Sequence, residues 1–311
     1  MKIIAVLAIK AKTSLTLKSL GKIIFYLLAT VVLGALLAAP LYWGGQWLAH
    51  HGILTWLGDT PFRKFFHRGL LVAALVLLWP TARWLQVASV RALGLAPNPR
   101  RWGDLGAGFA TAFLMMAALT AVLLGLHVVE LRDHVPPMDF VQIALSAVVV
   151  SLLEEGLFRG AILGLLARNM NRWIALFFTS ALFSILHFLK PETAEPHAIH
   201  WLSGFALIPG AFAQFGDPWL LLGGFTTLFC VGWILGFSRL KTRSLWMAVG
   251  LHAGWVVGIM SFTKATHRLM KVEQTLPWFG GDLKVGLGSV AVVLLTGLLV
   301  WRYLANRAPR A

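Results

Sequence analysis

Two adjacent carboxylates, Glu154 and Glu155, follow a long stretch of apolar sequence. Residues 140–153 contain no charged side chain. A carboxylate at bilayer depth costs about a few kcal/mol, and two like charges side by side also repel each other. A sequence retains such a pair only when another group compensates it or when the pair is used. We therefore take the two glutamates as the centre of a candidate site.

Arg159 stands four residues after Glu155. Residues at this spacing share one face of a helix and can form an ion pair. Glu154 is rotated by about 100° and faces elsewhere. The pattern predicts one carboxylate braced by arginine beside one available carboxylate, Glu154, which is the better base. The alternative is a buried pair that only fixes helix packing.

Two histidines lie deep in other apolar runs, His187 and His252. Glu154 and His187 are nearly equidistant along the chain from the polar residues at 169–171, so a helix on each side of that turn brings both to a similar depth. His252 points away from the helix face that carries Gly250, Gly254 and Gly258, a pattern of small residues typical of close helix contacts. Taken singly, each histidine could also be a core residue bonded to a backbone carbonyl.

A carboxylate beside imidazoles can activate water. The glutamate takes the proton, and a histidine orients the water or stabilises the oxyanion. Glu154, His187 and His252 also match a catalytic zinc set of two histidines and one glutamate, although no H-E-x-x-H motif is present. We favour the version without a metal and keep zinc as the alternative.

The composition places these residues in a membrane. The chain is 58% hydrophobic and 13% charged, which is typical of an integral membrane protein. Its single cysteine excludes an intrachain disulfide. Apolar runs near the length that a bilayer requires predict an all-α polytopic membrane protein, a bundle of about eight transmembrane helices. The runs are 23–43, 69–88, 106–128, 138–166, 172–189, 218–237, 244–262 and 284–303.

The net charge of +15 comes from basic residues that flank the apolar runs. Topology explains them better than nucleic acid does, so we expect the lipid bilayer as a partner and no nucleic acid. The distribution of lysine and arginine predicts that both termini are cytoplasmic. We expect the bacterial inner (cell) membrane as the location.

Three short motifs resemble one known family. EEGLFR at 154–159 resembles the EExxxR motif of the CPBP family, the CAAX protease and bacteriocin-processing enzymes, also called Abi. FSILH at 183–187 resembles its FxxxH motif, and His252 its third motif, usually HxxxN. The third motif departs from the family pattern, because Val256 stands where the family often has asparagine.

The resemblance covers about 135–260 and implies an intramembrane endopeptidase similar to type II CAAX prenyl endopeptidases. By matching position, Glu154 is the base, Glu155 and Arg159 support it, and His187 and His252 complete the site. Phe183 and Trp255 are predicted to contact the substrate. Within one integrated membrane domain we expect three parts: N-terminal membrane helices at 1–134, the catalytic core at 135–260, and an outer loop with the C-terminal helix at 261–311.

The predicted function is hydrolysis of a peptide bond in a membrane-anchored peptide or protein. One alternative is a proton-coupled transporter that uses Glu154 and the histidines as a relay. The paired broken spans that transporter repeats often show are not visible in this sequence, which disfavours it. The other alternative is a non-catalytic membrane binding protein on the same scaffold.

Overall fold

The computed structural model describes residues 2–85, 87, 89, 91, 95–188, 198–218 and 220–306. These residues form two compact units. The first unit combines Met1–Ala88 with Phe188–Gly216, and the second combines Ser89–His187 with Asp217–Ala311.

The first unit is a helical hairpin with a short third helix. It contains α1 (Lys2–His50), α2 (Phe62–Trp84) and α7 (Ser203–Gly210), with 3₁₀ turns at Thr55–Leu57 and Ala213–Gly216. Small residues let these backbones meet. A Cβ on Gly204 would lie 2.1 Å from the carbonyl oxygen of Ala35, which is fully buried. Phe62 and Phe66 of α2 and Leu207 of α7 complete the buried cluster.

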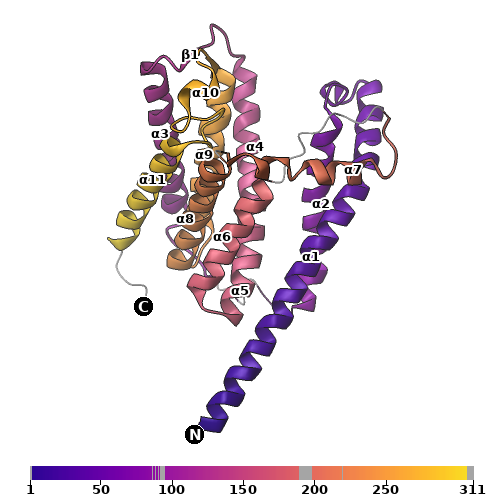
Figure 1. Ribbon diagram of the computed structural model, residues 1–311, viewed down its shortest axis with the longest axis vertical. Helices are drawn as coiled ribbons and strands as arrows, with labels where there is room; N and C mark the ends of the chain where they lie inside the picture. The colour runs from indigo at the N-terminus through magenta and orange to yellow at the C-terminus, as the bar shows by residue number, and fades with distance from the viewer. Residues whose placement is uncertain are drawn as a thin grey trace. The chain divides into compact units, whose positions relative to one another are not determined.

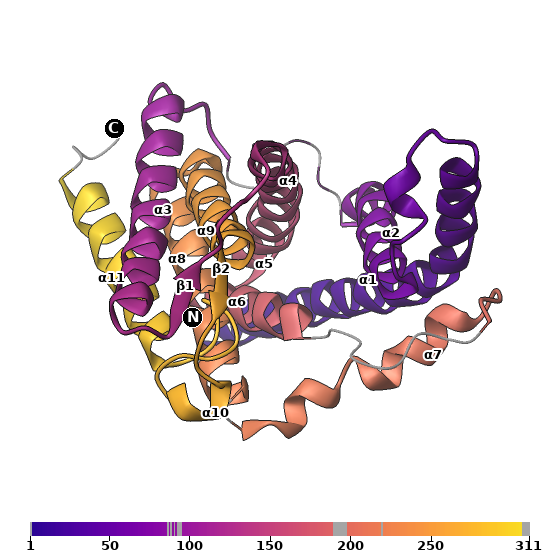
Figure 2. The ribbon, with the colours of Figure 1, turned by 90° about the horizontal axis from the view of Figure 1, so that it is seen from above.

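The second unit is a bundle arranged around α9 (Trp246–Ala265), which packs against α3, α4 and α8 (Figure 2). Its other elements are α3 (Arg101–Gly125), β1 (Val129–Leu131), α4 (Pro137–Glu155), α5 (Leu163–Asn169), α6 (Arg172–Phe188), α8 (Thr226–Thr242), β2 (Thr266–Arg268), α10 (Val272–Thr275) and α11 (Leu287–Ala305). α3 packs against both α9 and α11. The division of the chain at 134 and 260 stays a prediction.

In the part of the chain that the structure describes, two stretches of π-helix interrupt the α-helical pattern, at Gly156–Ile162 and Leu220–Phe225. The first one joins α4 to α5 directly after the two glutamates. The sequence predicted one span at 138–166, but the helix widens there into i→i+5 geometry. Such wide turns are rare and occur frequently at functional sites.

Among the described residues, seven helices are long and apolar enough to cross a membrane. They are Gly21–His50, Phe62–Trp84, Arg101–Gly125, Pro137–Arg168, Leu220–Thr242, Trp246–Ala265 and Leu287–Ala305. The span predicted at 172–189 is α6, an apolar helix of 17 residues. It rises about 26 Å, slightly less than the ~30 Å hydrocarbon core.

The all-α membrane fold is confirmed, and among the described residues the only sheet pairs β1 with β2 antiparallel, Val129 opposite Arg268. This small sheet and the α5–α6 turn lie at opposite ends of the second unit (Figure 1).

The glycine ridge of α9 forms the contact with α3. A Cβ on Gly250 would lie 2.1 Å from the carbonyl oxygen of Leu105, and one on Gly254 would lie 2.5 Å from that of Phe109. We expect Gly250→Ala to lower the thermal stability and folded yield in detergent, because overpacking costs about 1–3 kcal/mol and backbone cannot move aside easily. Gly106→Ala on α3 is the control, since nothing lies within 4 Å of its added Cβ. Equal melting temperatures for the two variants would contradict this packing.

Candidate active site

Glu155 is the last residue of α4 and is completely buried. Arg159, also completely buried, donates from Nη1 to Glu155 Oε1 at 2.9 Å, as the spacing of four predicted. The second guanidinium nitrogen, Nη2, donates to the carbonyl oxygen of Gly232 on α8 at 3.3 Å. The guanidinium also lies over the ring of Phe183, 4.3 Å from its centroid. Arg159 therefore ties together three helical segments and neutralises one of the two carboxylates.

His252 of α9 is held by the same carboxylate. Its Nδ1 lies 2.8 Å from Glu155 Oε1. An ionised carboxylate paired with arginine only accepts hydrogen bonds, so Nδ1 carries the proton and donates it. This leaves Nε2 to face Glu154, whose Oε2 is 3.9 Å away. Glu155 thus orients the His252 ring, as a buried carboxylate orients histidine in a catalytic triad.

His187 of α6 is anchored in a parallel way. Its Nδ1 lies 2.8 Å from the backbone oxygen of Phe183, and a carbonyl oxygen can only accept, so Nδ1 again donates. Its Nε2 lies 3.4 Å from Glu154 Oε2. Both imidazoles therefore donate a hydrogen bond from Nδ1 to a fixed acceptor and present Nε2 to the same oxygen of Glu154.

Glu154 Oε2 lies where those two ring nitrogens converge. The atom is buried and has no hydrogen-bond partner among the described residues, while the side chain as a whole is 22% exposed. Buried polar atoms without a partner are rare and require an explanation. A neutral imidazole with its proton at Nδ1 has a lone pair at Nε2, and a carboxylate oxygen also only accepts. A hydrogen bond between Glu154 and either histidine therefore requires one further proton, shared among Glu154, His187 and His252. The arrangement can accept a proton from a bound water and hold it.

Glu154, His187 and His252 are also the candidate zinc ligands. Their Oε2–Nε2 separations are 3.4 and 3.9 Å, and in the described part of the chain no three histidine, cysteine or acidic side chains are placed to hold a metal ion. Ligand atoms that share one tetrahedral zinc ion at about 2.0–2.1 Å are themselves about 3.4 Å apart, so these separations do not decide between a zinc site and a metal-free site, and the metal dependence stays a prediction.

Phe183 and Trp255, predicted to contact the substrate, are both buried. Phe183 packs edge-on against Phe158, 5.2 Å between ring centroids, and its ring centroid is 4.1 Å from that of His187. Trp255 belongs to the buried cluster around α9, and its indole Nε1 has no hydrogen-bond partner among the described residues. Substrate contact by either residue stays a prediction. The structure adds two roles for Phe183. Its ring packs against the guanidinium of Arg159, and its backbone carbonyl accepts the hydrogen bond that orients His187.

The sequence did not predict three hydrogen bonds of the site: from His252 to Glu155, from His187 to the Phe183 carbonyl, and from Arg159 to the Gly232 carbonyl. The first had a weak signal, because histidine and glutamate were both expected in the site. The two carbonyls had none, since backbone atoms carry no residue identity.

Comparison with known proteins gives one match. Residues 136–258 match the family described as type II CAAX prenyl endopeptidase Rce1-like. No curated protein and no solved structure matches the chain. The matched range contains Glu154, Glu155, Arg159, His187 and His252, and it agrees with the 135–260 range over which the motifs resemble the CPBP family. Over residues 136–258 the chain is therefore similar to the family described as type II CAAX prenyl endopeptidase Rce1-like.

Proposed function

We propose that this protein is an intramembrane endopeptidase that hydrolyses a peptide bond in a membrane-anchored peptide or protein, with Glu154 as the general base. One observation carries the proposal. Glu154 Oε2 faces the Nε2 atoms of His187 and His252, at 3.4 and 3.9 Å, while both Nδ1 atoms are held by fixed acceptors. The Rce1-like domain supports the reaction class.

The proposed reaction begins with a water hydrogen-bonded to Glu154 Oε2. The carboxylate takes a proton from this water as its oxygen bonds to the carbonyl carbon of the substrate. One of the two histidines carries the further proton as an imidazolium, with Nδ1 still bound to its fixed acceptor, and donates a hydrogen bond from Nε2 to the carbonyl oxygen, which becomes an oxyanion. When the C–N bond breaks, Glu154 returns its proton to the leaving amine. Glu155 and Arg159 contribute by fixing the ring of His252.

The experiment uses the full-length protein in lipid nanodiscs with one fluorogenic peptide prepared in three forms: farnesylated at a C-terminal cysteine, acylated, and without a lipid. Products are identified by mass spectrometry. We expect cleavage of a lipid-anchored form and little cleavage of the free peptide. If a chelator abolishes the activity and zinc restores it, a metal rather than Glu154 alone activates the water. Proton flux through proteoliposomes without any cleavage would instead support the transporter.

Val256 gives a prediction about the oxyanion. It lies half-buried on α9, one turn after His252 and on the same helix face. We expect Val256→Asn to leave the cleavage rate unchanged or to raise it, because an added amide donor would stabilise the developing charge. Loss of one such donor costs about 10²–10³ in rate in other enzymes. Val257→Asn, rotated by about 100°, is the matched control. A rate gain at both positions, or a tenfold loss at 256 alone, would contradict the assignment.

A further inference from the structure

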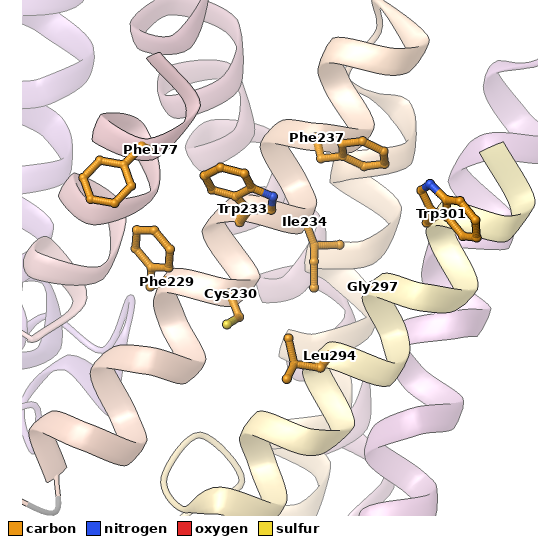
Figure 3. Close-up of a pocket in the computed structure, with 9 residues that line it drawn as sticks. All are labelled: Phe177, Phe229, Cys230, Trp233, Ile234, Phe237, Leu294, Gly297 and Trp301. Carbon is orange, nitrogen blue, oxygen red and sulfur yellow. The ribbon is translucent and has the colours of Figure 1, made fainter. Parts of the chain in front are cut away.

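A concave surface lies on the second unit, between α6, α8 and α11 (Figure 3). Its volume is about 470 Å³. Phe177 comes from α6, Trp233 and Phe237 from α8, and Leu294, Gly297 and Trp301 from α11. Gly297 lets α11 approach α8, since an added Cβ would lie 3.0 Å from Ile234 Cδ1. We call this surface the α8–α11 groove. All of its side chains are apolar or aromatic, apart from the thiol of Cys230.

Two of the helices that form the groove, α8 and α11, belong to helices long and apolar enough to cross a membrane. Phe177, Leu294 and Trp301 are each more than half exposed, although large apolar side chains are rarely gathered on a surface that faces water. From Phe229 to Phe237 the groove follows about two turns of α8, or roughly 12 Å. This is a length over which hydrocarbon can lie along the helices.

Basic side chains stand at one end of this groove. Trp173 stacks with two groove residues, Phe237 at 6.4 Å and Trp233 at 6.5 Å between ring centroids. The guanidinium of Arg172 lies 5.2 Å from the centroid of Trp173, and the ammonium of Lys241 lies 5.8 Å from that of Phe237. Two cations from two helices therefore flank one aromatic stack that closes the groove. Figure 1 places the start of α6 and the ends of α8 and α11 at the same end of the unit.

No acidic side chain balances these charges nearby in the helices that form the groove. The sequences of α6, α8 and α11 contain no aspartate or glutamate. Within the described ranges, neither Arg172 nor Lys241 forms an ion pair with a carboxylate. Both side chains are exposed. The end of the groove is therefore positively charged and able to bind an anion.

We propose that the α8–α11 groove binds an anionic phospholipid of the surrounding bilayer. One acyl chain lies along the aromatic and aliphatic wall, and the phosphate is bound by Arg172 and Lys241 at its basic end. Basic pockets between membrane helices bind anionic headgroups in this way. The apolar groove favours a lipid over free phosphate, because only the lipid has an acyl chain that can fill the groove. The site uses none of the residues that surround Glu154, so it stands or falls independently of the proposed protease activity.

The test measures lipid binding to the purified full-length protein by native mass spectrometry, with phosphatidylglycerol and phosphatidylcholine of identical acyl chains. We expect saturable binding of phosphatidylglycerol that Arg172→Gln/Lys241→Gln weakens by about 30-fold, as the loss of two charges near a headgroup predicts. Leu294→Trp, which fills the groove, should weaken both lipids.

The matched control is Lys22→Gln/Arg83→Gln in the first unit. Lys22 and Arg83 also lie over tryptophan rings, Trp84 and Trp79, so this variant removes equal charge from the same kind of contact. It should bind phosphatidylglycerol like the wild type. Three results would overturn the proposal: equal losses in both double variants, equal binding of the two lipids, or displacement of the lipid by inorganic phosphate alone. Displacement by the farnesylated peptide would assign the groove to substrate and overturn it as well.

Discussion

Glu154→Gln is expected to abolish cleavage of the anchored peptide while the protein remains folded. The amide has nearly the shape of the carboxylate but cannot take a proton from water. Loss of general-base catalysis costs about 10²–10⁴ in rate. The side chain makes no hydrogen bond through Oε2 to another described residue, so its replacement removes little that holds the fold. Initial cleavage rates and thermal melting in the same nanodiscs measure both effects.

The control for this variant is Glu130→Gln. Glu130 on β1 pairs with His267 on β2, so it is also a glutamate beside a histidine, but it is exposed and lies in the small sheet. We expect its cleavage rate to match the wild type. A Glu154→Gln protein that cleaves at more than a tenth of the wild-type rate would end the proposed mechanism.

The second large effect concerns folding. Arg159→Met should destabilise the protein by about 3–5 kcal/mol, because it leaves Glu155 buried without its positive partner. The change also removes the bond to the Gly232 carbonyl and the contact with Phe183. The measurement is reversible unfolding in detergent by increasing SDS, with the yield of monodisperse protein as a second reading.

A double variant separates charge from packing. In Glu155→Gln/Arg159→Met the buried position is neutral, and the glutamine oxygen can still accept from His252 Nδ1. Replacing both partners of a buried ion pair is often nearly neutral for stability. We expect most of the lost stability to return. Stability equal to that of the single variant would assign the loss to packing rather than to the uncompensated carboxylate.

Local spacing predicted those parts of the site that one helix determines. Glu155 and Arg159 are four residues apart, and the pair forms because neighbours on a helix face meet whatever the rest of the fold does. Equal distances from the α5–α6 turn brought Glu154 and His187 to the same depth, since both flanking segments are helical. The face of α9 opposite its glycines was expected to carry His252, and it does.

Contacts between distant segments could not be predicted in the same way. The hydrogen bond from His252 to Glu155 depends on how α9 rotates against α4, and this rotation follows from the close approach of Gly250 and Gly254 to α3. Hydrophobic periodicity also gave no sign of the π-helical segment, because an apolar run reads the same in α and π geometry. The span predicted at 172–189 agrees with α6 (Arg172–Phe188) over the described residues, because polar residues at 169–171 mark where the apolar run begins.

Because Gly156–Ile162 is π-helical, the number of residues in this segment determines the geometry of the site as much as the side chains do. An i→i+5 turn holds one residue more than the α-helical turn it replaces. Removing a single residue there would allow regular α-helix to return, and every side chain on α5 would rotate by about 100° relative to the two glutamates. If the lost residue followed Arg159, every motif letter and the spacing of four from Glu155 would be kept, and only the side chains after that point would turn. A homologous sequence that is one residue shorter between the glutamates and Leu163 would therefore not share this geometry.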